Sequence, residues 1–224
     1  MLQAVVFGLV TGISLAVGSV VGLSDRVPKA LAGVLLAFAS GALMFTTATE
    51  LIQHPLEQAP MWSILVAVPL GALAFLGLNA LSDRLSAGNQ GSVTLLIGVM
   101  VDGIPENLAL GSSIGPALLY SIVATNFPEA LTGARDMRTR TSWSRRRVVS
   151  IWSLGGLLLT LAVLAGYFLT QFVSDEVTAV INAFAGGAVV ASLFAAAVPE
   201  GHDQGGSWAA MGTAVGFVIA AVIA

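Results

Sequence analysis

The stretch "VDGIPENLALGSSIGPALLYSIVATNFPEALTGA" (Val101–Ala134) decides how this chain folds. It contains parts of two apolar segments, which the dipeptide Ile114-Gly115 separates. So short a connection predicts two helices that lie side by side and antiparallel. Both helices carry a Pro-Glu pair in surroundings apolar enough for lipid, so the fold must accommodate carboxylates beside prolines.

The composition places these two helices in a membrane protein. Of the 224 residues, 56% are hydrophobic and 9% are charged, and the mean hydropathy is +0.91. Soluble domains carry about 25% charged residues, so the surface of this chain must face lipid. The sequence contains no Cys, which excludes disulfides, thiolate metal sites and cysteine nucleophiles.

Eight segments have the apolar length that a membrane span needs, about 20 residues. They are continuously apolar and show no alternation, which favours helices over barrel strands. The predicted spans are Leu2–Leu23, Lys29–Ile52, Met61–Leu81, Ser92–Ser113, Pro116–Ala134, Val148–Phe172, Val177–Glu200 and Ser207–Ala224. We therefore predict an all-α integral membrane protein of eight transmembrane helices in one domain, residues 1–224.

The basic residues predict the orientation of these spans. All nine Lys and Arg residues fall on alternate connections, namely the first, the third and the fifth. They are Arg26, Lys29, Arg84, Arg135, Arg138, Arg140, Arg145, Arg146 and Arg147. By the positive-inside rule these connections are cytoplasmic and both termini are extracytoplasmic. We expect a multi-pass protein of a prokaryotic cell membrane.

Two parts of the sequence echo each other at a fixed spacing. "AFASGALM" (Ala37–Met44) resembles "AFAGGAVV" (Ala183–Val190), 146 residues later, and the same spacing places His54 over Glu200. The two segments run in opposite directions across the membrane, which indicates an inverted repeat of the kind found in transporters. The alternative is chance, because small-residue packing motifs recur in membrane helices.

The repeat predicts a 3+2+3 arrangement of helices. Residues 1–81 form the first three-helix repeat and residues 148–224 the second, inverted one. Residues 92–134 form the central pair between them.

The Pro-Glu helices carry a predicted metal site. Asp102 and Glu106 share one helix face, and Thr125, Asn126 and Glu129 lie close together on the other helix. A charge at the bilayer centre costs about 2.5–3.5 kcal/mol on insertion scales. These groups must therefore meet one another, a cation, protons or water.

The prolines add oxygen ligands to this site. Pro105 and Pro128 cannot donate to the carbonyls of Val101 and Ala124. No Lys or Arg lies within a span, so the cluster is anionic and rich in oxygen, as a hard or borderline divalent cation requires. Protons compete for the same oxygens, which predicts pH-dependent occupancy. The alternative is that each glutamate is protonated and packs at a proline kink.

Paired Pro-Glu motifs on the fourth and fifth of eight spans resemble the ZIP (Zrt/Irt-like) family of divalent-metal transporters. "AAAVPEGHD" at the end of the seventh span supports the resemblance. The resemblance implies a helical bundle that moves zinc or related metals toward the cytoplasm, frequently as a dimer. It also implies a metal site on the fourth and fifth spans.

The match to the family motif is partial. The fourth-span pattern His-Asn-x-Pro-Glu-Gly reads Asp102-Gly-Ile-Pro-Glu-Asn107 here, so Asp102 replaces the histidine and Gly103 the asparagine. The sixth span, "SIWSLGGLLLT" (Ser150–Thr160), lacks the acid of many members. An all-oxygen site shifts the expected metal from zinc toward Mn²⁺ or Fe²⁺, although Zn²⁺ or Cd²⁺ still binds. These departures favour one metal position over two.

Polar residues at the span ends are candidate ligands where the cation enters and leaves. Glu50 and His54 lie at the outer end of the second span, and Glu200 and His202 at the inner end of the seventh. The alternative is that these interfacial charges are simply solvated. We expect Asn79 and Asn182 to form hydrogen bonds between helices.

The expected function is transport of divalent metal cations. A proton-linked carrier, a passive channel and a metal-binding homologue that transports nothing stay open as alternatives. We expect no enzyme, because the sequence lacks a His-Glu-x-x-His motif and its one Lys, Lys29, lies at a connection. We interpret the arginine-rich stretch as a determinant of membrane topology that lies beside anionic lipid, rather than as a surface that binds nucleic acid. Gly71 and Gly77 are candidates for a homodimer interface.

Overall fold

A computed structural model describes the chain apart from residues 25, 87–91, 114 and 224. The side chains at positions 83, 85, 86, 92–99 and 102 also lie outside the description. The described residues are almost entirely helical and include no strand, which confirms the predicted all-α class.

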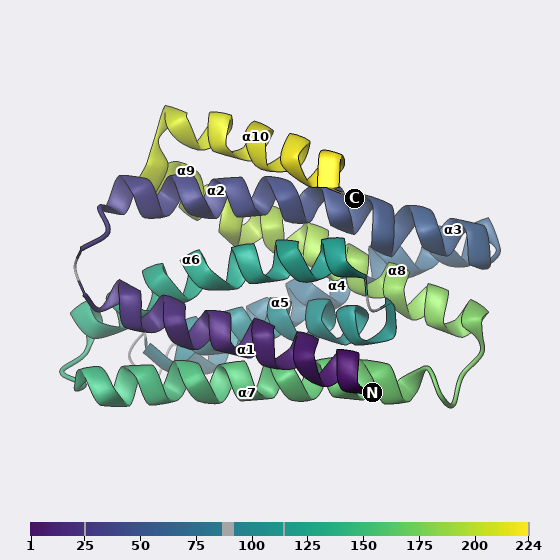
Figure 1. The fold of residues 1–224 in the computed structure, drawn as a ribbon, viewed down its shortest axis with the longest axis horizontal. Helices are drawn as coiled ribbons and strands as arrows, with labels where there is room; N and C mark the ends of the chain where they lie inside the picture. The colour runs from purple at the N-terminus through teal and green to yellow at the C-terminus, as the bar shows by residue number, and fades with distance from the viewer. Residues whose placement is uncertain (25, 87–91, 114, 224) are drawn as a thin grey trace.

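The helices form eight rods that run roughly along the long axis of the molecule (Figure 1). In chain order they are α1 (Leu2–Gly22), α2 (Lys29–Thr46), η1 (Thr47–Gln53), α3 (His54–Gln58), α4 (Met61–Ser86), α5 (Ser92–Ser113), α6 (Pro116–Arg140), α7 (Arg145–Leu169), α8 (Asp175–Ser192), η2 (Leu193–Ala197), α9 (Val198–Gly205) and α10 (Ser207–Ile223). The π-helical segments η1 and η2 join their neighbours into continuous rods from α2 to α3 and from α8 to α9.

Within the part of the chain that the structure describes, five rods are long and apolar enough to cross a membrane. They are Leu2–Gly22, Lys29–Gln58, Met61–Ser82, Arg145–Leu169 and Asp175–Gly205. Among the remaining rods, α10 is shorter, at 17 residues, and α5 and α6 contain the polar Pro-Glu motifs. The five apolar helices indicate a membrane protein, as predicted.

The fifth rod, α6, shows where the predicted boundaries are wrong. α6 continues to Arg140, six residues beyond the predicted end, and α7 begins at Arg145. Most of the arginine-rich stretch is therefore helix rather than loop. Arginines in the last turn of α6 complement the negative end of the helix dipole, and the Ser144 hydroxyl caps α7 by accepting from the Arg147 N–H.

The α5–α6 hairpin lies inside a shell formed by the other rods. α6 packs against α1 and α2, whereas α5 packs against α7 and α8. Large apolar side chains on the outer helices are exposed, among them Leu65 and Leu73 of α4 and Leu154 of α7. These side chains provide the surface that lipid would contact.

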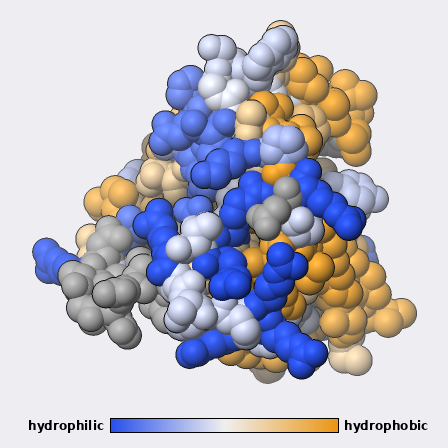
Figure 2. Space-filling view, turned by 90° about the vertical axis from the view of Figure 1, so that its left-hand side faces the viewer, coloured by the Kyte–Doolittle hydropathy of each residue, from blue (hydrophilic) through white to orange (hydrophobic). Residues whose placement is uncertain are grey.

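The connections at one end of the bundle carry the basic residues. The α1–α2 and α6–α7 connections lie together at the left of Figure 1. Viewed from that side, hydrophilic residues gather over the end of the molecule and hydrophobic ones along its flank (Figure 2). We refer to this as the basic end.

Glycines bring the outer helices into backbone contact in two matching places. A Cβ at Gly71 of α4 would overlap the carbonyl oxygen of Phe184 on α8, and a Cβ at Gly216 of α10 would overlap that of Phe38 on α2. Phe184 follows Phe38 by 146 residues and Gly216 follows Gly71 by 145. The α4–α8 and α10–α2 contacts therefore use equivalent positions. Gly71 packs against α8 in this contact, so it is not available to a second copy of the chain. A Cβ at Gly77 would meet nothing within 4 Å, so of the two glycines Gly77 stays a candidate for the predicted dimer.

We expect a methyl group at these contacts to destabilise the bundle. A Cβ at Gly41 would overlap the Thr213 carbonyl oxygen, so Gly41→Ala must force α2 and α10 apart. The expected loss in the free energy of unfolding is about 1–3 kcal/mol, measured by denaturation in detergent. Gly77→Ala is the matched control and should be neutral or slightly stabilising. Equal stability of the two variants would contradict the described packing.

Candidate functional site

The helices that carry the Pro-Glu pairs continue through their prolines. Pro105 lies inside α5 and Pro128 inside α6. The carboxylate-bearing Glu106 is only 5% exposed, and Glu129 is partly buried. Both side chains therefore lie against protein rather than open to lipid, as expected for acids in a membrane-spanning bundle.

One face of α6 is polar over much of its length. Ser121, Thr125, Glu129, Thr132 and Asp136 follow one another at spacings of three or four residues, which aligns them on the helix. The Thr125 hydroxyl donates to Ser121 O at 3.1 Å and the Thr132 hydroxyl to Pro128 O at 3.0 Å. Because the Thr125 hydroxyl proton is used within the helix, its oxygen presents lone pairs to its surroundings. We call these five residues the α6 polar face.

Each of the two Pro-Glu helices has a buried asparagine, Asn126 on α6 and Asn107 on α5. Asn126 is 1% exposed and its Nδ2 donates to Thr11 O of α1 at 3.4 Å. Asn107 is fully buried and its Nδ2 donates to Gly103 O at 2.9 Å. No described residue donates to Asn107 Oδ1. Such a buried acceptor is an oxygen ligand that a cation could satisfy.

Sequence reasoning missed Asn107 as a candidate ligand. It entered only as a departure from the glycine of the family motif. The available signal was an amide directly after Glu106 in an otherwise apolar helix. Packing explains why a glycine stands at position 103, since a Cβ there would lie 3.0 Å from Cδ2 of the buried Leu159.

The predicted carboxylate triad is not tested by the described residues. They contain no group of three or more His, Asp or Glu side chains that could hold a metal ion. Asp102 lies on α5, but its side chain is outside the description. Its place beside Glu106 and Glu129 therefore stays a prediction.

A polar cavity of about 650 Å³ opens at the end of the molecule opposite the basic end. It lies among α3, α5, α7 and α8. Its lining residues are Glu50, His54, Pro55, Gln58, Ser112, Ser113, Thr170, Asp175, Thr178 and Asn182. We call it the outer cavity. It includes both residues predicted for this end, together with Asp175, which sequence reasoning missed although the connections on that side are acidic.

Glu50 and His54 approach each other in the outer cavity. His54 Nδ1 lies 3.7 Å from Glu50 Oε2, one turn apart where η1 meets α3. The π-helical η1 immediately precedes His54-Pro55, and such segments are frequent at functional sites. A side chain at Gly115, in the turn between α5 and α6, would come within 3.3 Å of Glu50 Oε2. The glycine therefore leaves room for the carboxylate beside the hairpin.

The outer cavity also contains the predicted helix-to-helix hydrogen bond of Asn182. Ser112 of α5 donates its hydroxyl proton to Asn182 Oδ1 of α8, which confirms that prediction. The bond joins the end of the central hairpin to the rod that follows α7.

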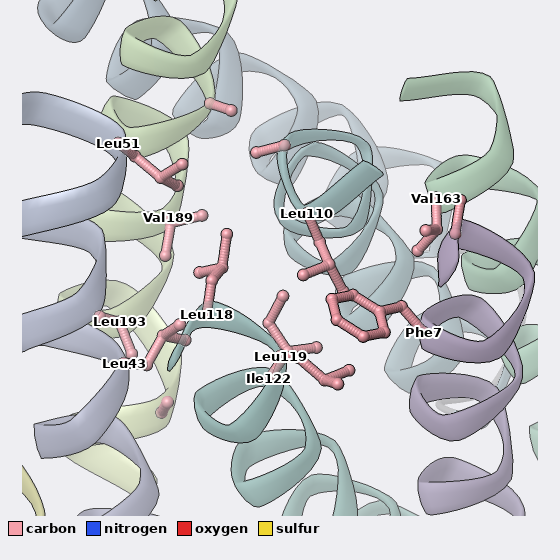
Figure 3. Close-up of a cluster of buried hydrophobic side chains, with 14 of the residues drawn as sticks. Phe7, Leu43, Leu51, Leu110, Leu118, Leu119, Ile122, Val163, Val189 and Leu193 are labelled. Atoms are coloured by element: carbon pink, nitrogen blue, oxygen red, sulfur yellow. The ribbon is translucent and has the colours of Figure 1, made fainter. Parts of the chain in front are cut away.

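A buried apolar layer lies between the outer cavity and the Pro-Glu level. It consists of Leu110 on α5 with Leu118 and Ile122 on α6, which are fully buried. These three belong to a larger apolar cluster with members on α1, α2, η1, α7, α8 and η2, all at most 9% exposed. Figure 3 shows these side chains converging on the space around the α5–α6 hairpin. Leu110 follows Glu106 by one helical turn and precedes Ser113 by another. This apolar layer therefore separates Glu106 from the polar side chains of the cavity.

At the basic end, Glu200 of α9 meets the α6 polar face. It lies beside Thr132 and Asp136 and accepts a hydrogen bond from Gln204 Nε2 at 2.9 Å. His202 is exposed. Two residues of helix separate the side chains of His202 and Glu200 by about 200° around the axis, so the structure does not bring this predicted pair together.

The chain matches no protein-family model and no curated protein.

Cysteine labelling can test the apolar layer, because the natural chain is free of cysteine. Ser113→Cys places a thiol in the outer cavity, and Leu110→Cys places one a turn deeper, at a position that is fully buried. A membrane-impermeant maleimide should label Ser113→Cys and leave Leu110→Cys unmodified. Labelling is measured by mass shift, and equal modification of both would show that water reaches past the layer.

Proposed function

We propose that this protein transports divalent metal cations along the α6 polar face, as a divergent relative of the ZIP family in fold and function. The observation that carries the proposal is Glu106, which is 5% exposed beside the fully buried Asn107. Asn107 Oδ1 receives no hydrogen bond from a described residue. Acceptor oxygens at such depth favour a cation, because they offer nothing to an anion.

An eight-span, 3+2+3 inverted repeat is the fold that we propose for this transporter. The equivalent glycine contacts of α4–α8 and α10–α2 support it. So do the π-helical segments, because η2 begins at Leu193, 146 residues after η1 begins at Thr47. Trp62 and Trp208 are separated by the same 146 residues, and both are exposed, at 70% and 72%, as expected for tryptophans at the two membrane interfaces.

The proposed path leads past three groups of polar residues. A cation first enters the outer cavity, where Glu50 and Asp175 provide carboxylates and His54 an imidazole. It then reaches Glu106 and Glu129 once the apolar layer opens. Thr132, Asp136 and Glu200 finally lead it to the basic end. Because the apolar layer is closed in this structure, transport requires a conformational change.

The central ligands favour a metal that accepts oxygen. Carboxylate, amide and hydroxyl oxygens are available from Glu106, Glu129, Asn107 and Thr125, with Asp102 as the further predicted ligand. Mn²⁺ and Fe²⁺ suit such a set, whereas Zn²⁺ and Cd²⁺ prefer nitrogen or sulfur but bind oxygen when it is what the site offers.

A proton-linked carrier is the second candidate function. It is favoured by the enclosure of Glu106 and Glu129 in the bundle, since protonatable carboxyls that protein covers are all that such a carrier needs. Glu106 and Glu129 would then cycle protons without a metal ligand shell.

Metal flux separates these candidates. Purified protein in liposomes should take up Mn²⁺, Fe²⁺, Zn²⁺ or Cd²⁺ saturably. We expect Glu106→Gln and Glu129→Gln to lower uptake by more than about 100-fold, beyond the roughly 10–100-fold typical of losing a group that only supports a ligand. Asn107→Leu should weaken uptake as well.

Glu176→Gln is the matched control for these variants. It removes one carboxylate from an exposed position in the first turn of α8, so transport should be unchanged. Parental uptake by Glu106→Gln would exclude the central site. A proton flux that persists without metal, and that the same variant abolishes, would instead support the carrier.

The proposed topology has its own test. Ser142 and Gln171 are exposed in the α6–α7 and α7–α8 connections, at opposite ends of the bundle (Figure 1). In whole cells, an impermeant maleimide should label Gln171→Cys, while Ser142→Cys should react only after permeabilisation. The reverse pattern would invert the orientation, and labelling of both would contradict the number of spans.

A further inference from the structure

A second cavity, of about 270 Å³, lies at the basic end between α1, α6 and α7. Its lining residues are Gly22, Leu23, Arg135, Arg138, Thr139 and Arg145. Three of the six are arginines and none is acidic. Asp136 follows the lining residue Arg135, and its carboxylate pairs with Arg140 at 3.4 Å. The cavity therefore has a positive lining, which suits an anion.

Two of the arginines are held in place by backbone carbonyls. Arg135 Nη2 donates to Val27 O at 2.7 Å, and Arg138 Nη1 donates to Trp143 O at 2.9 Å. A guanidinium has five N–H donors, so each of these bonds fixes the group while leaving further donors for a ligand. Preorganised guanidiniums of this kind match the geometry of a phosphate group.

The depth of the cavity corresponds to the level of lipid headgroups. It lies where α1 and α6 end and α7 begins. Trp143 in the same connection is partly buried and stacks with Arg147, whose guanidinium carbon lies 4.1 Å from the ring centroid. Within two turns before the cavity, α1 exposes the apolar Val17 and Val20, at 47% and 54%. A phosphate in the cavity would thus have an apolar flank beside it on which acyl chains can lie.

We propose that this cavity binds the phosphate of an anionic phospholipid from the leaflet at the basic end. Basic pockets between membrane helices on the cytoplasmic side are suited to such headgroups. A free phosphate ion offers the same charge, but it would gain nothing from the apolar flank of α1. The site is independent of metal transport, because its residues lie on neither the α6 polar face nor the outer cavity.

Binding of phosphatidylglycerol to the delipidated full chain tests the proposal. Native mass spectrometry with phosphatidylglycerol and phosphatidylcholine measures the preference for the anionic lipid. Arg138→Gln/Arg145→Gln should weaken phosphatidylglycerol binding about tenfold or more, with phosphatidylcholine unchanged. Arg140→Gln/Arg146→Gln removes the same charge outside the cavity lining and should change binding less than twofold.

Further variants and measurements distinguish a specific lipid site from misfolding, from net charge and from a free anion. Arg138→Lys retains the charge without the planar fork of arginine. It should weaken binding by less than the double variant does, and this conservative variant also controls for misfolding. Thermal unfolding in lipid-free detergent should match the parent for all variants. Equal losses in the two double variants would show that net charge alone attracts lipid and would overturn the site. Displacement of phosphatidylglycerol by millimolar inorganic phosphate would assign the cavity to a free anion and overturn the lipid.

Discussion

A carboxylate cannot face hydrocarbon, and the arrangement of this molecule follows from that constraint. Glu106 and the α6 polar face lie in helices that would be unstable alone in lipid, because their charges and hydroxyls would lose water without compensation. The other rods solve this problem by surrounding the hairpin, with α1 and α2 against α6 and with α7 and α8 against α5. Their outer faces expose leucines and valines instead.

Enclosure of the hairpin requires outer helices that approach closely. Apolar side chains gain little by leaving lipid for protein, so tight backbone packing has to supply the stability. Glycines on facing helices provide it, as in the contacts of Gly71 with Phe184 and of Gly216 with Phe38. The two contacts lie at matching positions of α4–α8 and α10–α2, which is the packing that the proposed inverted repeat would require.

The polar residues near the two ends of the molecule follow π-helical turns within continuous rods rather than loops. At the outer end, the π-helical η1 leads into His54-Pro55, and at the inner end η2 leads into Pro199-Glu200. A widened turn before a proline rearranges the backbone hydrogen bonds where polar side chains are needed. Between these two ends, the apolar layer around Leu110 and Ile122 separates the outer cavity from Glu106.

The sequence by itself determined the helical class, the existence of eight helical segments and the antiparallel hairpin, because apolar length and a two-residue connection are local properties. It also identified Glu106, Glu129, Thr125 and Asn126 as polar residues in apolar surroundings. Only the tertiary structure decided which of them are enclosed, and it added Asn107, Asp175 and the contact of Gly115 with Glu50. It also showed that Glu200 lies beside α6 while His202 is exposed. These features depend on residues far apart in the chain, and packing between helices, which no local pattern encodes, brings them together.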